Sequence, residues 1–324
     1  MIIKNNRLSE NEIIFKHLRK LNFGNKESFN FKNDGALIKK KRNAEIIVTN
    51  DIITESIDFF KDDTADSVAQ KIMTCNLSDL SSMGAIPYSY TLSLSIPKGI
   101  SREWISVFVN KLLYLQKKYK IFLLGGDICK SSKICISANF FGYAKKKLIL
   151  QREFPKIGED IWVTGNIGES YLGLQIKKKK LKVNKLFTKY YINKYLFPKP
   201  CMIGEKIAKV SKYGIDISDG FLGDLSKLLG SKLGAEISLS NIPFSANTNL
   251  LIKDNKINPI TLLNGGDDYE LIFTTPIKND KIIRRIGINS RVKITKIGRI
   301  VDKKGIIIDN KKLTKSKNSY QYFF

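Results

Sequence analysis

A series of aspartates in short, turn-prone segments constrains this chain more than any other feature. Gly, Ser or Asn bounds these segments, which is typical of turns beside strands and helices rather than of solvated helix faces. The chain has 56 Lys and Arg residues but only 30 Asp and Glu residues, so acidic residues gathered in turns indicate a site for hard cations such as Mg²⁺. The aspartates of these segments are Asp34, Asp51, Asp79, Asp127, Asp216, Asp219, Asp267 and Asp268.

Length and cysteine content limit the class of protein. The 324 residues, 43% of them hydrophobic, suffice for two domains with cores. Cys75, Cys129, Cys135 and Cys201 form no CxxC pair and the chain has a single histidine, so neither a zinc site nor a disulfide framework is indicated. We expect these cysteines to be buried small hydrophobes in a reducing compartment. Without a signal peptide or a run of about 18 apolar residues, we expect a cytoplasmic protein with no membrane partner.

The formal net charge of +26 raises the question of a nucleic-acid partner, because clustered Lys and Arg release counterions from phosphates. The lysines are instead spread through loops with many Ile and Asn residues, and no nucleic-acid-binding motif with interleaved aromatic residues is present. The densest run, residues 177–180, lies in a predicted surface connection. The sequence therefore predicts no nucleic-acid partner.

In the first half of the chain, apolar periodicity predicts strands and helices that alternate. A strand over 45–51 delivers an acidic residue to a loop, and the helix that follows carries Asp79 in its later turns. A half-buried strand over 89–96 precedes an amphipathic helix for which Ser101 is the predicted N-cap. The segment 121–127 is predicted to be a short buried strand that breaks on its two glycines.

The tract 144–159 is rich in Lys, Pro and Gly, and we place the domain boundary there. This gives an N-terminal domain over 1–148 and a C-terminal domain over 149–324. Strands and helices are mixed in the second half as well, and residues 176–200 are predicted to be a long basic connection or insertion. The predicted class is therefore α/β or α+β with two domains.

The segment DISDG places two aspartates three residues apart at a predicted strand-to-helix turn, with Ser218 between them and Gly220 permitting a tight backbone. Backbone N–H groups at the start of that helix can bind phosphate oxygens while the carboxylates hold metal. The alternative is that these residues simply cap the helix. Two further glycine-aspartate segments, at 125–127 and 265–268, have glycines that let a backbone approach a phosphate closely.

Other catalytic arrangements are missing from the sequence. There is no GxxxxGK[ST] phosphate-binding loop and no protein-kinase motif set. His17, the one histidine, lies in a predicted amphipathic N-terminal helix and is expected at the surface, so no His-based triad can be assembled. Phosphoryl transfer suits what remains, because it depends on positioning and charge neutralisation more than on covalent chemistry.

The order and wording of five motifs resemble the thiamine-monophosphate kinase family, within the superfamily that includes aminoimidazole ribonucleotide synthetase. NLSDLSSMGA, LLGGD, DIWVTGNIG, DISDGFLGDL and GGDDYEL are similar to that family's motifs and occur in the same order, from about residue 10 to the C-terminus. The resemblance implies ATP-dependent phosphorylation of thiamine monophosphate to thiamine diphosphate, with several Mg²⁺ ions and ATP as co-substrate. The implied mechanism is direct in-line transfer without a general base, because the acceptor phosphate is already ionised.

The same resemblance implies the fold and the site residues. It implies an N-terminal domain whose sheet pairs across a homodimer and a C-terminal α/β domain. The residues that match the family's metal positions are Asp34, Thr49, Asn50, Asp51, Asp79, Asp127, Asp216 and Asp219. Those that match its nucleotide contacts are Gly126, Asp127, Arg152 and Ser218, and those that match its substrate contacts are Asp58, Asp267 and Tyr320, with Tyr322 as the rival of Tyr320.

The departures from the family pattern lie mainly on the vitamin side. Asp58 stands where the family commonly has a His, and Asp267 replaces a Glu. Asn33 and Asn50 replace an Asp and a Thr next to metal positions and keep an oxygen ligand. The alternatives are another ATP-using enzyme of the superfamily with a different acceptor, and a basic, non-catalytic nucleotide-binding protein. Retention of the aspartates disfavours the latter, and the lack of a Cys in residues 1–34 or at the YQYFF end disfavours the selenium and hydrogenase-maturation relatives.

Overall fold

The computed structural model of the chain describes residues 8–152 and 154–313, which form two compact units. Unit 1 is formed within Met1–Leu77 and Pro87–Tyr143, and unit 2 within Ser78–Ile86 and Ala144–Phe324. The chain thus enters unit 2 briefly, returns to unit 1, and enters unit 2 again near the predicted boundary. The division into domains at residues 148 and 149 remains a prediction. Tyr320 and Tyr322 lie outside the described residues.

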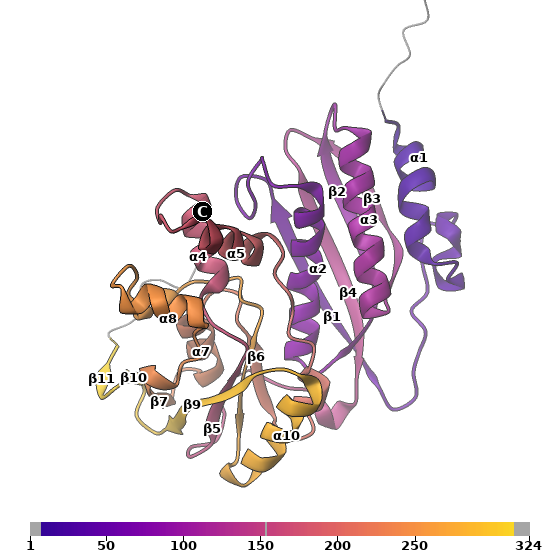
Figure 1. Cartoon of the computed structure of the whole chain (residues 1–324). Coiled ribbons are helices and arrows are strands. Elements are labelled where there is room, and N and C mark those ends of the chain that lie inside the picture. Colours follow the sequence, from indigo (N-terminus) through magenta and orange to yellow (C-terminus); the bar gives the residue numbers. More distant parts are fainter. Residues whose placement is uncertain (1–7, 153, 314–324) are drawn as a thin grey trace, which may run out of the picture. The chain divides into compact units, whose positions relative to one another are not determined.

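Unit 1 is built on a sheet of strand order β1-β4-β2-β3, with two long helices along one of its faces (Figure 1). The strands are β1 (Glu45–Thr54), β2 (Ile86–Pro97), β3 (Phe122–Ser131) and β4 (Cys135–Ala144), and the helices are α2 (Ala65–Ser82) and α3 (Arg102–Tyr119). Short helical turns near the N-terminus pack beside α3: α1 (Glu10–Glu12), η1 (Ile13–His17), η2 (Leu18–Asn22) and η3 (Lys26–Phe31). His17, expected at the surface of a regular helix, is instead half-buried in a π-helical turn.

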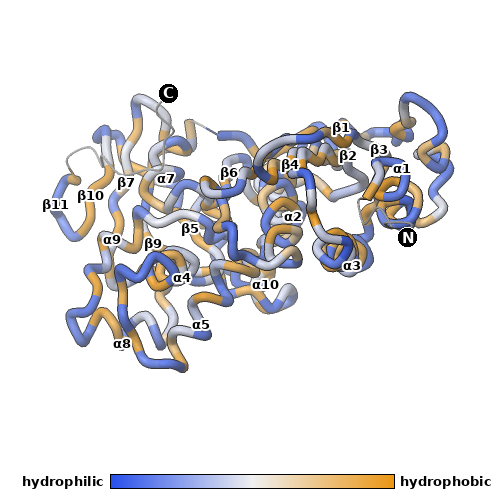
Figure 2. Tube along the Cα trace, turned by 90° about the horizontal axis from the view of Figure 1, so that it is seen from above, coloured by the Kyte–Doolittle hydropathy of each residue, from blue (hydrophilic) through white to orange (hydrophobic). Residues whose placement is uncertain are grey.

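Helix α3 forms where the apolar spacing predicts it. The Ser101 side chain accepts a hydrogen bond from the Trp104 N–H at 3.0 Å, which confirms Ser101 as the N-cap. Buried residues recur at helical spacing, among them Ile105, Phe108 and Leu112, so one stripe of the helix packs on the sheet. The alternation of hydrophobic and hydrophilic residues along α3 is visible in Figure 2.

Strand β3 corrects one prediction, because it does not break at its two glycines. It continues to Ser131, paired in parallel with β2, with a register shift between Tyr90 and Thr91. A Cβ on Gly126 would lie 1.8 Å from the Leu92 carbonyl oxygen. Glycine therefore keeps this strand close to its neighbour and does not end it.

Unit 2 contains a mixed sheet of strand order β11-β10-β7-β9-β5-β8-β6. Its strands are β5 (Asp160–Thr164), β6 (Tyr213–Asp216), β7 (Gly234–Ile237), β8 (Leu271–Thr275), β9 (Ile294–Val301), β10 (Gly305–Ile308) and β11 (Lys311–Lys312). Its helices are η4 (Lys146–Leu148), α4 (Glu169–Lys177), α5 (Lys185–Leu196), α6 (Gly204–Ile207), α7 (Phe221–Leu229), η5 (Leu239–Asn241), α8 (Ala246–Lys253), α9 (Pro259–Leu263), η6 (Ile277–Asn279) and α10 (Asp280–Ser290).

The central strands of this sheet are buried on both faces. On β5, Ile161 and Val163 enter one hydrophobic cluster while Trp162 between them enters another. On β8, Ile272 and Phe273 divide in the same way. Because successive side chains of a strand point to opposite faces, helices must cover both sides of the sheet. The two sheets with their helices confirm the predicted α/β class.

Two other predictions are wrong in part. The basic stretch 176–200 is not merely a connection, because α5 lies within it and buries Tyr191 and Tyr195. Of the four free cysteines only Cys201 is buried, whereas Cys129 is exposed on an edge strand. Within the described ranges, none of the helices combines the length and the apolar character that crossing a membrane requires.

Candidate functional site

The strongest site feature of unit 2 is a buried carboxylate at the end of β6. Asp216 is 1% exposed, and its Oδ2 accepts a hydrogen bond from the Ser78 hydroxyl at 2.8 Å. Its Oδ1 has no hydrogen-bond partner among the described residues. Burial raises the pKa of Asp216, and the nearby charge of Asp79 raises it further. Two carboxylates that repel each other, one with an unused buried oxygen, have the chemistry of a cation site.

The turn after Asp216 is held by an acid that the sequence analysis did not identify. Asp224, in the first turns of α7, accepts hydrogen bonds from the N–H groups of Ser218 at 3.0 Å and Asp219 at 2.9 Å. Lys227 binds the other Asp224 oxygen at 2.8 Å and also pairs with Asp219. Asp224 thus occupies the N–H groups of Ser218 and Asp219, which precede α7, while the expectation that N–H groups at the start of the helix bind phosphate oxygens stays a prediction. DISDGFLGDL contains Asp224, but only the folded turn shows what it binds.

A second turn, residues 264–270, lies against the first. The Asp267 N–H donates to the Ser218 carbonyl oxygen at 2.9 Å, and the Tyr269 N–H donates to the Ile217 carbonyl oxygen at 2.8 Å. The Tyr269 hydroxyl also donates to Asp267 Oδ1 at 2.9 Å. The structure therefore brings Ser218 and Asp267, predicted to contact nucleotide and substrate respectively, onto adjoining turns of one unit.

Two further acids of the second turn face the interior of unit 2. Asp268 Oδ2 accepts the Gly168 N–H at 2.8 Å, and desolvation raises the pKa of this carboxyl well above its usual value. Glu270 Oε2 accepts the Thr164 hydroxyl at 2.5 Å, and desolvation raises the pKa of Glu270 to about 7. Sequence reasoning gave neither residue a specific role, because their partners are more than ninety positions away in the chain.

Arg152 completes the predicted residues of unit 2. It is exposed, and its positive charge acts on Asp216, whose pKa it lowers slightly against the larger effects of burial and Asp79. Over residues 8–152 and 154–313, no three His, Cys, Asp or Glu side chains come together as a metal-binding group. The fit to a cation in unit 2 thus rests on the pair Asp79 and Asp216.

In unit 1, Asp127 lies on β3 opposite Ser93 of β2. Its Oδ1 accepts the N–H of the next residue at 2.9 Å, and its side chain lines a small hollow of about 90 Å³ together with Ser137. Asn50 of β1 donates to the Ser137 hydroxyl at 3.2 Å and to Asn139 Oδ1 at 2.8 Å. Asn50 and Asp127 therefore lie on the same face of this sheet.

The remaining predicted residues of unit 1 are dispersed. Strand alternation places Thr49 and Asp51 on the face opposite Asn50. Asp34 is exposed in the irregular segment between η3 and β1. Asp58 Oδ2 accepts the Thr54 N–H at 2.7 Å, so this carboxylate closes the turn after β1. This contact gives Asp58 a local role in the turn.

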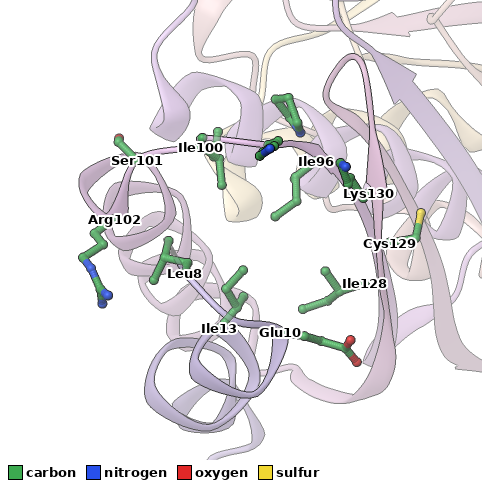
Figure 3. Close-up of a pocket in the computed structure, with 13 residues that line it drawn as sticks. Leu8, Glu10, Ile13, Ile96, Ile100, Ser101, Arg102, Ile128, Cys129 and Lys130 are labelled. Carbon is green, nitrogen blue, oxygen red and sulfur yellow. The ribbon is translucent and has the colours of Figure 1, made fainter. Parts of the chain in front are cut away.

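A larger cavity of about 810 Å³ in unit 1 contains none of the predicted site residues. It lies between the N-terminal turns, the loop before α3 and the end of β3, and Ile13, Ile96 and Ile128 point toward one another across it (Figure 3). Its walls are mostly apolar, with Lys98 and Lys130 at its margin. Size alone does not mark this cavity as the reactive site, because its lining includes Glu10 but none of the aspartates predicted for the site.

Comparison with known proteins identifies related sequences and structures. Residues 32–144 match the family model described as AIR synthase related protein, N-terminal domain. The chain is 38% identical to the thiamine-monophosphate kinase of Buchnera aphidicola subsp. Schizaphis graminum, over 90% of this chain and 91% of that protein. It is similar to the crystal structure of thiamine-monophosphate kinase from Stenotrophomonas maltophilia K279a, with a TM-score of 0.79, 26% identity, and coverage of 96% of this chain and 94% of that one. A structure described as AaThiL complexed with AMPPCP and TMP matches with a TM-score of 0.77 and 26% identity, over 89% and 91% of the two chains.

Proposed function

The chain belongs to the thiamine-monophosphate kinase family, and we propose that it transfers the terminal phosphoryl group of ATP to thiamine monophosphate, giving thiamine diphosphate. The observation that carries this proposal is the buried Asp216 with its unused oxygen beside Asp79 and Arg152. Such a site suits a cation that is shared with nucleotide phosphates. We expect the enzyme to act in the cytoplasm.

The residues of unit 2 have distinct proposed roles. Asp79 and Asp216 would hold Mg²⁺, with Asp219 released from Lys227 as a further ligand. Arg152 and Ser218 would bind the nucleotide phosphates, and Asp267 would bind the vitamin. Bound magnesium neutralises negative charge on the phosphates of the donor and acceptor. The acceptor phosphate is already ionised, so the protein needs to position it in line rather than remove a proton.

The residues proposed for unit 1 supply the remaining contacts. Gly126, which lets β3 pair closely with Leu92 of β2, is proposed to contact the nucleotide through its backbone, and Asp127 offers an exposed carboxylate on the same strand. We propose that metal is also bound by residues of β1 and of the segment before it, namely Asp34, Thr49, Asn50 and Asp51. Asp58 is proposed on the substrate side, where its turn-closing hydrogen bond fixes its position.

We also propose a homodimer that forms through the sheet of unit 1. Ile46, Val48 and Ile52 of β1 are 43%, 55% and 60% exposed and share one face of the strand. Apolar side chains repeated along an edge strand favour pairing with another chain. Sedimentation of the wild type and of Val48→Lys tests this proposal, because a dimer should become a monomer in the variant while a wild-type monomer would exclude it.

The direct test of the function is ADP release by the purified protein with Mg²⁺ and ATP. Three reactions are compared: with thiamine monophosphate, with free thiamine, and without an acceptor. We expect ADP only with thiamine monophosphate, together with an equal amount of thiamine diphosphate. Nucleotide binding without acceptor-dependent turnover would reject the proposed acceptor and direct attention to the substitutions at Asp58 and Asp267.

A further inference from the structure

The two turns of unit 2 that carry the proposed nucleotide and vitamin contacts are joined beyond the end of their strands. The last paired residues of β6 and β8 are Asp216 and Leu271. Past them, the Ile217 N–H donates to the Glu270 carbonyl oxygen at 2.8 Å, and the Asp267 N–H donates to Ser218 as described above. The backbone hydrogen bonds thus extend from the strands into both turns.

Glycines let these turns approach more closely than other residues would. A Cβ on Gly266 would lie 2.1 Å from the Ser218 carbonyl oxygen, and a Cβ on Gly220 would lie 2.6 Å from the Asn264 carbonyl oxygen. Side chains at these positions would collide with backbone, which cannot swing away as the end of a flexible side chain can. Because the contact is direct, a displacement of one turn displaces the other.

The second turn is held in an unfavourable backbone conformation. Asp267 and Tyr269 have φ values of 66° and 52°, in the left-handed region, although neither is a glycine. This region is sterically unfavourable for residues that carry a Cβ. Neighbouring interactions must therefore fix the turn, and strain of this kind is concentrated at binding sites.

Asp268, which lies between the two strained residues, supplies one such interaction. Its side chain accepts the N–H of Gly168, the residue that precedes helix α4. Gly168 is itself fixed, with a φ of 84° and a Cβ position that would lie 2.9 Å from the Leu262 Cβ. The positive end of the α4 dipole favours a carboxylate at this point. The turn is thus attached to a helix on one side and to the turn that carries Ser218 on the other.

We propose that Asp268 is a positioning residue that fixes turn 264–270 between α4 and the Ser218 turn, and thereby couples binding of thiamine monophosphate at Asp267 to binding of ATP at Ser218. The inference rests on the proposed function of the site. Because the turns are in direct contact, a ligand that draws one turn into its binding position carries the other with it, and each ligand then raises the affinity of the other by the same factor.

The test measures the affinity of a non-hydrolysable ATP analogue with Mg²⁺ by calorimetry, with and without saturating thiamine monophosphate. In the wild type we expect the vitamin ester to tighten nucleotide binding about fivefold or more. Asp268→Ala should reduce that factor to nearly one, whereas Asp268→Asn, which keeps an oxygen acceptor for the Gly168 N–H, should retain most of it. Asp302→Asn, at an exposed position of unit 2, is the matched control and should leave the factor unchanged.

A purely structural role for Asp268 predicts a different outcome, in which both affinities fall and their ratio does not change. That result would overturn the coupling but not the proposed function. The same holds if the wild type turns over thiamine monophosphate but binds the nucleotide equally well with and without thiamine monophosphate. A wild type without turnover would overturn the proposed function and the coupling with it. If Asp268→Ala does not fold, Asp268→Glu keeps the charge but lengthens the arm, and an unchanged coupling factor in that variant would overturn the proposal.

Discussion

Asp216 ends β6 and Asp224 lies in the first turns of α7, and both side chains are about 1% exposed, yet their surroundings differ completely. Asp224 is paired on every side, by two backbone N–H groups and by Lys227. Asp216 has one hydroxyl partner, an unused oxygen and a neighbouring acid that repels it. A buried carboxylate whose hydrogen bonds are complete serves the fold, whereas one that is left incomplete serves a ligand.

Replacement of Asp216 tests this contrast with the largest expected effect. Asp216→Asn should lower turnover by about 100-fold or more, because a charge that balances cation and phosphates is lost. The same variant should be more stable than the wild type without metal, by about 1 kcal/mol, since an uncompensated buried acid is removed. Steady-state kinetics measure the loss of turnover, and urea unfolding with and without Mg²⁺ measures the change in stability, because Mg²⁺ should stabilise the wild type and not the variant. Wild-type turnover in Asp216→Asn would contradict the proposed metal role.

Replacement of Asp224 should give the opposite pattern in stability. Asp224→Ala leaves two N–H groups and Lys227 without their acceptor, so the free energy of unfolding should fall by about 3 kcal/mol. Added Mg²⁺ should not restore the loss. Asp224→Asn, which keeps one acceptor oxygen, is the matched comparison and should lose less. If Asp224→Ala unfolds like the wild type, the turn is held by other contacts.

Glu270 is an intermediate case, since it is a desolvated acid with one hydroxyl partner. Its pKa of about 7 lies above the ordinary 4.5, so the folded protein binds this proton more tightly than the unfolded chain does. Its stabilising contribution is complete below about pH 4.5 and is lost as the pH rises through about 7, with a loss of at most about 3 kcal/mol. The free energy of unfolding, measured from pH 4.5 to 8, should decline in the wild type and in the control variant Glu205→Gln. The decline should be weaker in Glu270→Gln. Identical pH profiles in all three proteins would exclude Glu270 as the cause.

Lys227 should show the smallest effect of the four. Its side chain is 42% exposed, and solvent screens its pairs with Asp219 and Asp224. Lys227→Met should therefore lower the free energy of unfolding by about 1 kcal/mol or less. If Asp219 binds metal, the variant should also bind Mg²⁺ more tightly, because that carboxylate no longer has a competing cation. A Mg²⁺ titration with thermal unfolding as the readout compares the metal affinity of the variant with that of the wild type. Weaker metal binding in the variant would instead assign Lys227 a direct role at the site.

Sequence patterns predicted the features that depend on neighbours in the chain. The N-cap at Ser101, the strand that ends at Asp216 and the order of the glycine-aspartate turns are all local. Helix α5 escaped prediction because its buried face consists of tyrosines among lysines, which blurs the apolar period. The helices α8, α9 and α10 were also not identified from the sequence patterns.

The supporting residues of the site could not be predicted because their partners are distant in the chain. Asp268 and Gly168 are 100 positions apart, and Glu270 and Thr164 are 106 apart. A single sequence does not identify which of its acidic residues will form hydrogen bonds with residues so distant in the chain. The resemblance to a family supplied the predicted roles of the site residues, but the acids that hold the turns became visible only in the fold.

The assignment of residues 78–86 to unit 2 has a consequence for how this protein can be made and divided. Ser78 binds Asp216, and Ser81 donates to the Cys201 carbonyl oxygen at 2.6 Å while Gly204 packs directly on the Ser81 backbone. A recombinant fragment that starts at Ala144 would lack all of these contacts. During synthesis, residues 78–86 leave the ribosome early, but they can form these contacts only after the chain beyond Asp216 has emerged. We therefore expect a fragment of unit 2 without residues 78–86 to be destabilised, and attempts to trim, split or permute the chain should keep residues 78–86 with it.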